Sequence, residues 1–414
     1  MKLTKLSAAV LFGLASSGSF AAALDRSGQS IASFLQPGNY FEAGISILDP
    51  DVSGTTRTGE KTGDMAGDYY FPSAALKIQA TDNISVGLIY DQPFGADAEY
   101  TQSNMFTSAL GNTEVEVDTQ NLSLILGFQP DENFNIYGGA VYQGVKGSVN
   151  LNGFAYSGSP ASNAVGFSGY KANISEDFDF GWLAGISYQI PEIALKASVT
   201  YRSKIKHKTT IDESSVGPSL GGLNPIPTII NGFNGAQETT IETPQSVNLD
   251  LQTGIMSNTV AFANLRWVNW KDFSIRPHSF GVAAGAATSS TPTTALQNPG
   301  KGFDLVAYKD DQISATVGVG RKFNDLWAGN VSVGWDSGAG DPVTTLGPTE
   351  GYWNLGLGLQ YSPTPSTFIA GGVKYFWLGD AKAQSGAQFG TNDYVAEFKD
   401  NDALAYGLKI GYKF

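Results

Sequence analysis

The chain ends in the stretch Ala403–Phe414, A-L-A-Y-G-L-K-I-G-Y-K-F, in which a large apolar residue stands at every second position. Side chains of a β-strand alternate between two faces, so one face of this stretch is wholly apolar and the other is small or charged. A helix would scatter the same residues around its surface. A water-soluble sheet could bury such a face. The terminal aromatic residue, together with an export signal at the other end of the chain, instead favours the closing strand of an outer-membrane β-barrel.

Residues 1–23 have the pattern of a secretory signal peptide. Lys2 and Lys5 give a positive start, the apolar centre V-L-F-G-L follows, and small residues permit cleavage after Ala21 or Ala23. The alternative, a membrane anchor, needs a longer apolar run. No later segment approaches about 18 consecutive apolar residues, so we expect no transmembrane helix.

Composition excludes several function classes. The chain has no cysteine, which rules out thiolate metal sites and thiol nucleophiles. The net charge of -13 argues against nucleic acid as a partner. The two histidines, His207 and His278, lie far apart and lack metal-ligand spacing. No nucleophile elbow, phosphate loop or dinucleotide fingerprint is present, so we predict no enzyme, no cofactor and no metal site.

From Tyr40 onward, strand-like runs are separated alternately by short and long connections. The short ones have the composition of tight turns, as at Pro130–Asn133. The long ones are Asn150–Glu176, Ile211–Pro244 and a third that ends at about Asp311. A soluble sandwich has no reason to segregate its loops by length, whereas outer-membrane barrels place short turns on the periplasmic side and long loops outside the cell.

We therefore predict an all-β fold, a transmembrane antiparallel β-barrel of about 14 strands over residues 40–414, in the bacterial outer membrane. Aromatic residues bracket the strands as interfacial girdles do, for example Trp327 and Trp335. The patternless segment Leu24–Asn39 is either a periplasmic tail or a short plug folded into the lumen, and we expect the plug.

The sharpest irregularity is Asp91–Asp97, D-Q-P-F-G-A-D, in the expected third strand. Proline removes a ladder donor and glycine frees the backbone, so Pro93, Phe94 and Gly95 predict either a kink that opens the barrel wall or the simple end of the strand. A gap in the wall would let an apolar ligand leave sideways into lipid.

Two of the long loops are unusually apolar. Their large apolar side chains either pack together as a cap or line a groove for an apolar ligand, and both can hold at once. The candidate ligand-binding residues are Phe154, Tyr156, Phe167, Tyr170, Leu220, Leu223, Ile226, Ile229, Ile230 and Phe233.

A row of basic residues follows the sixth connection. Arg202, Lys204, Lys206 and Lys208 share one face of a single continuous strand, and by parity with Val199 that face is luminal. These residues could meet a carboxylate head group. The alternatives are charge balance against luminal acidic residues, or contact with lipopolysaccharide at the rim.

Several stretches resemble the FadL/TodX family of outer-membrane transporters for long-chain fatty acids and other hydrophobic compounds. They are Tyr201–Lys204 at the end of a strand, Thr243–Val247 at the start of the next, the run W-V-N-W-K-D-F at Trp267–Phe273, and the terminal Tyr412–Phe414. The strand number, the two long loops and the irregular third strand also match, over nearly the whole mature chain.

The resemblance implies passive uptake of a fatty acid or hydrocarbon, captured between two long loops and released through the kinked third strand beside an N-terminal hatch. The chain departs from the family in an abbreviated hatch with Leu35–Gly38 in place of the usual Asn-Pro-Ala. We expect a monomer whose partners are a hydrophobic small molecule, membrane lipid and lipopolysaccharide. The alternatives are a general diffusion porin and a structural or adhesive surface protein.

Overall fold

The computed structural model describes residues 24–157, 166–216, 224–233, 235–289, 302–386, 388–389 and 392–414. The expected signal peptide and the candidate residues Leu220 and Leu223 lie outside these ranges.

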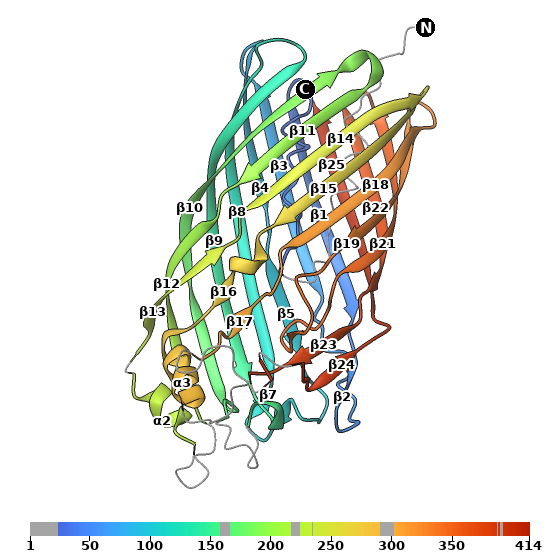
Figure 1. The fold of residues 1–414 in the computed structure, drawn as a ribbon. Helices are drawn as coiled ribbons and strands as arrows, with labels where there is room; N and C mark the ends of the chain where they lie inside the picture. The colour runs from blue at the N-terminus through green and yellow to red at the C-terminus, as the bar shows by residue number, and fades with distance from the viewer. Residues whose placement is uncertain are drawn as a thin grey trace.

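One closed antiparallel sheet makes up most of the molecule (Figure 1). The first strand pairs with both its successor and the last strand, which closes the sheet into a barrel. Three of the barrel strands are interrupted once, at β4/β5, β11/β12 and β13/β14, so that fourteen strands appear as seventeen segments. The prediction of a 14-stranded barrel is confirmed. The segments are β1 (Tyr40–Asp51), β3 (Tyr69–Gln79), β4 (Ile84–Asp91), β5 (Gly95–Glu99), β8 (Glu114–Phe128), β9 (Phe134–Leu151), β10 (Tyr170–Ile190), β11 (Leu195–Arg202), β12 (Ile205–Ser215), β13 (Gln237–Thr243), β14 (Ser246–Met256), β15 (Thr259–Val268), β18 (Gln312–Lys322), β19 (Trp327–Asp336), β21 (Tyr352–Thr364), β22 (Thr367–Leu378) and β25 (Asp402–Lys413).

The remaining elements belong to the connections. Most of them gather at the end of the barrel opposite the C-terminus (Figure 1). They are β2 (Gly54–Thr56), β20 (Val343–Thr344), β23 (Ala381–Gln384) and β24 (Ala396–Phe398) in one small sheet, the pairs β6 (Thr107–Ser108) with β7 (Gly111–Asn112) and β16 (Ser274–Ile275) with β17 (Val306–Ala307), the helices α2 (Ile226–Asn231) and α3 (His278–Ser289), and the short turns of 3-10 helix η1 (Phe154–Tyr156), η2 (Pro191–Ile193) and η4 (Trp270–Asp272).

The predicted tight turns are found, but two predicted long loops are shorter than expected. β10 begins at Tyr170 and β12 continues to Ser215, so each strand extends into residues that we expected to be loop. At these ends the outward positions of the strands become polar, as at Lys171 and Asn173, while the alternation continues. The barrel wall therefore rises beyond its apolar belt, and the sequence signal for a lipid-facing strand stops earlier than the strand does.

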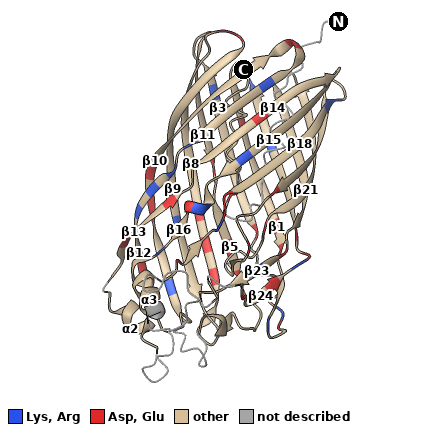
Figure 2. Cartoon of the chain, viewed as in Figure 1, with Lys and Arg blue, Asp and Glu red and all other residues tan. Residues whose placement is uncertain are grey.

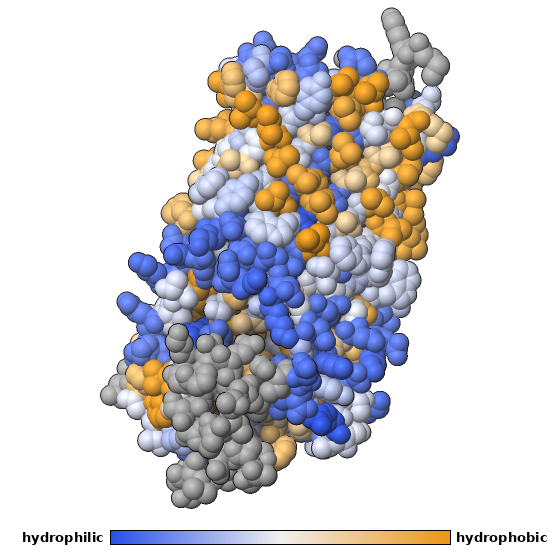
Figure 3. Space-filling model, viewed as in Figure 1, coloured by the Kyte–Doolittle hydropathy of each residue, from blue (hydrophilic) through white to orange (hydrophobic). Residues whose placement is uncertain are grey.

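The apolar belt lies nearer the C-terminus. In Figure 3 hydrophobic residues are gathered over the half of the visible face at that end, and hydrophilic residues cover much of the half nearest the loops. Aromatic residues of neighbouring strands stand side by side at the edges of the belt, as Trp335 does beside Trp353 and Trp327 beside Tyr361. Interfacial aromatic girdles have this arrangement. Among the described helices, none is both long and apolar enough to cross a membrane.

Two interruptions lie at one level. Ser203 and Lys204 separate β11 from β12, and Pro244 and Gln245 separate β13 from β14. On the side of the break with the short turns, β11 pairs with β14, and on the loop side β12 pairs with β13. β10 pairs with β11 and again with the far end of β12, but residues 175–182 of β10 have no ladder partner on this side. The β12–β13 hairpin is thus partly detached from the wall.

Candidate functional site

The third strand is interrupted at Gln92, Pro93 and Phe94, between β4 and β5. The strand then resumes its pairing with β8, so the structure has the interrupted strand and not its simple end. On the other side, β3 pairs with β4 only as far as the Ala74–Tyr90 position. The loop-side end of β3, residues 69–73, has a ladder partner only in β1, which leaves a gap in the wall between β3 and the interrupted strand. The gap ends on the loop side, where Ala66, just before β3, bridges Ala98 of β5.

The beginning of the described chain fills the inner side of this gap. Asp25 forms an antiparallel bridge with Phe94. The backbone N–H of Arg26 donates to the carbonyl of Pro93 at 2.6 Å, and the N–H of Gly95 donates to the carbonyl of Leu24 at 2.8 Å. Backbone groups that the interruption frees from the wall are therefore satisfied by the N-terminal segment, Leu24–Asn39, as buried backbone groups must be.

Buried side chains of the barrel hold the N-terminal segment in place. Arg266 of β15 forms an ion pair with Asp25, with Nε 2.7 Å from Oδ2 and both side chains almost fully buried. Arg202 of β11 donates from Nη2 to the carbonyl of Gln29 at 2.9 Å. Asn248 of β14 donates to the carbonyl of Gly28 at 2.8 Å. The two arginine bonds are charge-assisted and therefore the strong ones, and together with the neutral bond from Asn248 they hold the segment from three separate strands.

The other half of the segment packs by apolar contact. Phe34 lies edge-on to Tyr137 with ring centroids 5.7 Å apart, and it belongs to a buried cluster with Ile31 and Leu35. A Cβ on Gly87 would stand only 2.3 Å from the Phe34 ring. The wall is therefore shaped to this ring, because only glycine leaves it room.

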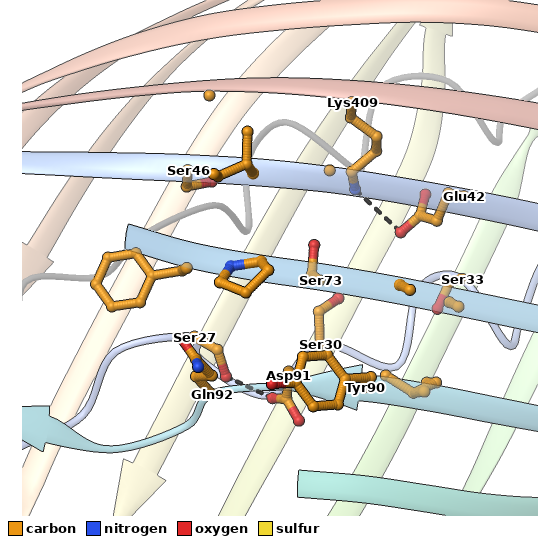
Figure 4. A pocket seen from close by; sticks show the side chains of 18 of the residues that line it. Ser27, Ser30, Ser33, Glu42, Ser46, Ser73, Tyr90, Asp91, Gln92 and Lys409 are labelled. Atoms are coloured by element: carbon orange, nitrogen blue, oxygen red, sulfur yellow. Dashed lines mark hydrogen bonds and ion pairs between the residues drawn. The ribbon is translucent and has the colours of Figure 1, made fainter. Parts of the chain in front are cut away.

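A cavity of about 100 Å³ lies between the N-terminal segment and the strands beside the gap. Its lining mixes polar side chains with apolar ones such as Ile45, Phe71 and Ile89, and Figure 4 shows side chains from the segment, from β1, β3 and β25 and from the interrupted strand turned toward one space. Ser27 donates to Asp91 at 2.5 Å, and Lys409 donates to Glu42 at 3.0 Å. We call this cavity the chamber. Its labelled lining residues are Ser27, Ser30, Ser33, Glu42, Ser46, Ser73, Tyr90, Asp91, Gln92 and Lys409.

A series of edge-to-face aromatic contacts leads from the gap toward the loops. The ring of Phe94 lies 5.4 Å from that of Trp270, which is fully buried. Trp270 in turn contacts Phe273 and Tyr308, each with ring centroids 5.1 Å away. The interrupted strand is thereby in direct contact with the connection that carries α3.

At the loop end, the structure gathers most of the predicted ligand-binding residues into one buried cap. Phe167 and Tyr170 are buried, as are Ile226 and Ile230 of α2, and Tyr156 is bonded through its hydroxyl to Thr345. Ile229 packs against the same cluster. Phe233 contacts the ring of His278 at the edge of α3. Phe154 is the exception, because it is 63% exposed and turned away from the cap interior.

Sequence reasoning missed the residues from the third long loop that complete this cap. Phe280 of α3 lies 4.5 Å from Phe167 and 5.2 Å from Tyr170, measured between ring centroids, and Phe303 lies 5.6 Å from Phe280. The buried carboxylate of Glu213 accepts hydrogen bonds from the first backbone N–H groups of α3 and from the Tyr170 hydroxyl. The signal that could have found them is the apolar run F-G-V-A-A-G-A-A after His278.

The predicted luminal row of basic residues is wrong beyond Arg202. Because Ser203 and Lys204 interrupt the strand, the parity of its faces changes there. Arg202 points into the lumen, whereas Lys204 and Lys206 point outward, are more than half exposed and form ion pairs with Glu242. Lys208 is exposed on the same outer face. Figure 2 shows basic and acidic residues interspersed on this part of the wall, along β10, β12 and β13.

The family model described as "Outer membrane protein transport protein (OMPP1/FadL/TodX)" matches residues 2–414. The chain belongs to this family. The FadL/TodX membership places it in the outer membrane as a multi-stranded transport protein and not as an enzyme. No group of three or more metal-ligating side chains occurs in the described part of the chain.

Solved structures of the FadL/TodX type share its fold. A Pseudomonas aeruginosa FadL homologue is 14% identical, with a TM-score of 0.69 over 99% of this chain and 98% of that one. The Pseudomonas putida toluene transporter TodX is 13% identical, with a TM-score of 0.59 over 92% and 91% of the two chains. The CymD monoaromatic hydrocarbon channel is 12% identical, with a TM-score of 0.53 over 92% and 90%. No curated protein matches the chain by sequence.

Proposed function

We propose that this FadL/TodX protein takes up a hydrophobic compound passively across the outer membrane, by capture at the cap and lateral release through the gap between β3 and β5. The observation that carries the proposal is the gap itself, with a chamber on its inner side and a separate chain segment in place of the missing wall. An apolar ligand that leaves sideways stays in lipid and avoids exposing its surface to water, at about 25 cal/mol per Å² of apolar area.

The cap supplies the capture step. Its buried aromatic and aliphatic side chains, with Phe167, Phe280 and Ile230 at their centre, form an apolar interior at the outer end of the barrel. Trp270, which contacts Phe94 at the gap, belongs to the same buried apolar cluster as these cap residues. Toluene is the compound named for TodX and a monoaromatic hydrocarbon for CymD, which supports an apolar ligand here. A long-chain fatty acid is the other candidate.

Uptake into liposomes that contain the purified protein tests the proposal. We expect labelled oleate or toluene to be taken up and a small labelled sugar to be excluded. Passage of the sugar without uptake of either apolar compound would establish a general diffusion porin instead.

The lateral route needs its own variant. A Cβ on Gly95 would stand 3.0 Å from the Val117 carbonyl and 3.6 Å from Nε of Arg26, so Gly95→Val places bulk where the segment meets the gap. We expect reduced uptake in a folded barrel. Gly371→Val is the matched control, because a Cβ there would meet no atom closer than 3.6 Å. Wild-type uptake by Gly95→Val would count against the lateral route.

A further inference from the structure

The luminal wall that the N-terminal segment does not anchor to is lined by small and polar residues. The segment is bonded to β3, β4, β5, β11, β14 and β15. Along β19, β21, β22 and β25 the inward positions alternate with exposed lipid-facing residues, and no large side chain except Lys374 stands at their middle. These inward residues are Asn330, Ser332, Gly356, Gly372, Lys374, Ala405 and Gly407.

Three buried polar atoms on this wall have no hydrogen-bond partner among the described residues. They are Nδ2 of Asn330, Oδ1 of Asn354 and Oε1 of Gln360. Asn354 is 4% exposed and Gln360 is 2% exposed. Leaving one such group unsatisfied costs about 1–3 kcal/mol, and a cavity water removes that cost wherever polar groups and space coincide. The wall is therefore chemically suited to water and not to an apolar ligand.

Space for water continues along the wall. A cavity of about 340 Å³ lies at the end with the short turns, the periplasmic mouth, and its luminal lining includes Ala328, Gln360 and Lys413. A smaller cavity, called here the second cavity, has a volume of about 10 Å³, which is room for one water. It begins at Asn330, the next inward residue after Ala328, and so lies about 7 Å along β19 from the cavity at the mouth. The second cavity shares Ser46 and Gly407 with the chamber.

Lys374 forms the narrowest point. A Cβ on Gly356 would stand 3.1 Å from Cγ of Lys374 and 2.6 Å from Oγ of Ser332, so the lysine stem lies across glycine backbone with little room on either side. Lys374 is only 7% exposed. The cavity at the mouth is lined by Lys413 and by Lys322, whose charge is balanced by its ion pair with Asp325 at 2.7 Å. Lys413 and Lys374 therefore give this wall the positive character that favours anions.

We propose that a water-filled passage runs along this wall from the periplasmic mouth to the chamber, with Lys374 as its constriction. The existence of the passage is inferred from the luminal packing alone, whereas its role depends on the proposed function. When an apolar ligand leaves the chamber through the wall, water from the periplasm fills the vacated volume. Lateral release therefore does not leave an empty cavity.

Labelling of single cysteines tests the passage, since the natural chain has none. Ser332→Cys and Ser46→Cys place reporters in the second cavity and at its junction with the chamber. Ser123→Cys is the control, because Ser123 is 1% exposed and lines neither cavity. Each folded variant, in liposomes, is treated with anionic and cationic methanethiosulfonates that do not cross lipid and that, being larger than one water, reach Ser332→Cys only when the Lys374 side chain moves aside.

We expect both reporters to react at least about tenfold faster than Ser123→Cys, with the anionic reagent ahead of the cationic one. Adding Lys374→Ala should accelerate labelling at Ser46→Cys and weaken the preference for the anion. Labelling of both reporters no faster than the control, or no response to Lys374→Ala, would overturn the proposal. Neither readout involves uptake of an apolar compound, so a failure here is separable from a failure of the proposed transport.

Discussion

Arg266 clasps Asp25 with two parallel hydrogen bonds, from Nε to Oδ2 at 2.7 Å and from Nη2 to Oδ1 at 3.1 Å. Asp25 is also the residue whose backbone bridges Phe94 at the interrupted strand. The ion pair and the closure of the wall therefore depend on one residue of the N-terminal segment, and displacement of that residue would disturb both.

The first prediction concerns this ion pair. Arg266→Met leaves the Asp25 carboxylate buried without its cation, a loss that costs about 3–5 kcal/mol in buried pairs. We expect the N-terminal segment to detach, and labelling of a Ser27→Cys reporter by a water-soluble reagent to accelerate. The double variant Asp25→Asn with Arg266→Met removes the uncompensated charge and should recover part of the thermal stability. Unchanged labelling in Arg266→Met would show that the segment is held by its other contacts.

The second prediction separates the cap interior from its surface. Phe280 is 1% exposed and contacts three aromatic rings, so Phe280→Ala should cost about 3–5 kcal/mol and lower uptake of an apolar compound. Phe154 is 63% exposed, so Phe154→Ala should change stability by no more than about 0.5 kcal/mol. Urea unfolding in lipid vesicles, together with uptake, measures both. Equal effects of the two variants would contradict the placement of these rings.

The third prediction contrasts the two faces of the basic row. Lys204 and Lys206 are exposed and paired with Glu242, and exposed pairs contribute about 0–1 kcal/mol, so their replacement by alanine should leave uptake and melting temperature nearly unchanged. Arg202 is buried and bonded to the Gln29 carbonyl, so Arg202→Met should weaken the hold on the N-terminal segment. Loss of uptake in the double lysine variant would revive a direct role for those residues in ligand contact.

The fourth prediction is a dependence on pH. Burial raises the pKa of Glu350, in the connection between β20 and β21, from 4.5 to about 7. The folded protein thus holds this proton more tightly than the unfolded chain does. The contribution of this group to the free energy of unfolding is largest below about pH 4.5. It is lost as the pH rises from about 4.5 to about 7, and above that pH it stays at the lower value. We expect the melting temperature to fall over this interval and Glu350→Gln to remove that component. A variant with the wild-type profile would assign the dependence to another group.

The sequence predicted the barrel well because lipid imposes a strict period of two on every strand that faces it. The turns, the strand number and the site of the break at Pro93 follow from local residue chemistry. Where the wall extends beyond the lipid, outward residues become polar and the pattern resembles that of a loop. For this reason the sequence places the start of β10 too late and the end of β12 too early.

The site was predicted less completely, because its members come together only through the fold. The parity argument for Lys204 and Lys206 assumed one unbroken strand, and nothing local to Ser203 indicates that the strand is broken there. Phe280 lies in a glycine- and alanine-rich run that gives little sign of a buried helix. The pairing of Asp25 with Arg266 joins residues 241 positions apart, a contact that no local pattern can specify.

The two breaks at Ser203–Lys204 and Pro244–Gln245 give the outer part of this wall a modular character. The β12–β13 hairpin, with α2 at its tip, is joined to the lipid-facing part of the barrel through the two short breaks, which lie side by side. It contributes part of the cap without contributing to the lipid-facing belt. Exchange of this single hairpin between homologous proteins would alter what the molecule admits while its lipid-facing belt stays the same. Diversification of ligand choice would then proceed by replacing one continuous piece of chain.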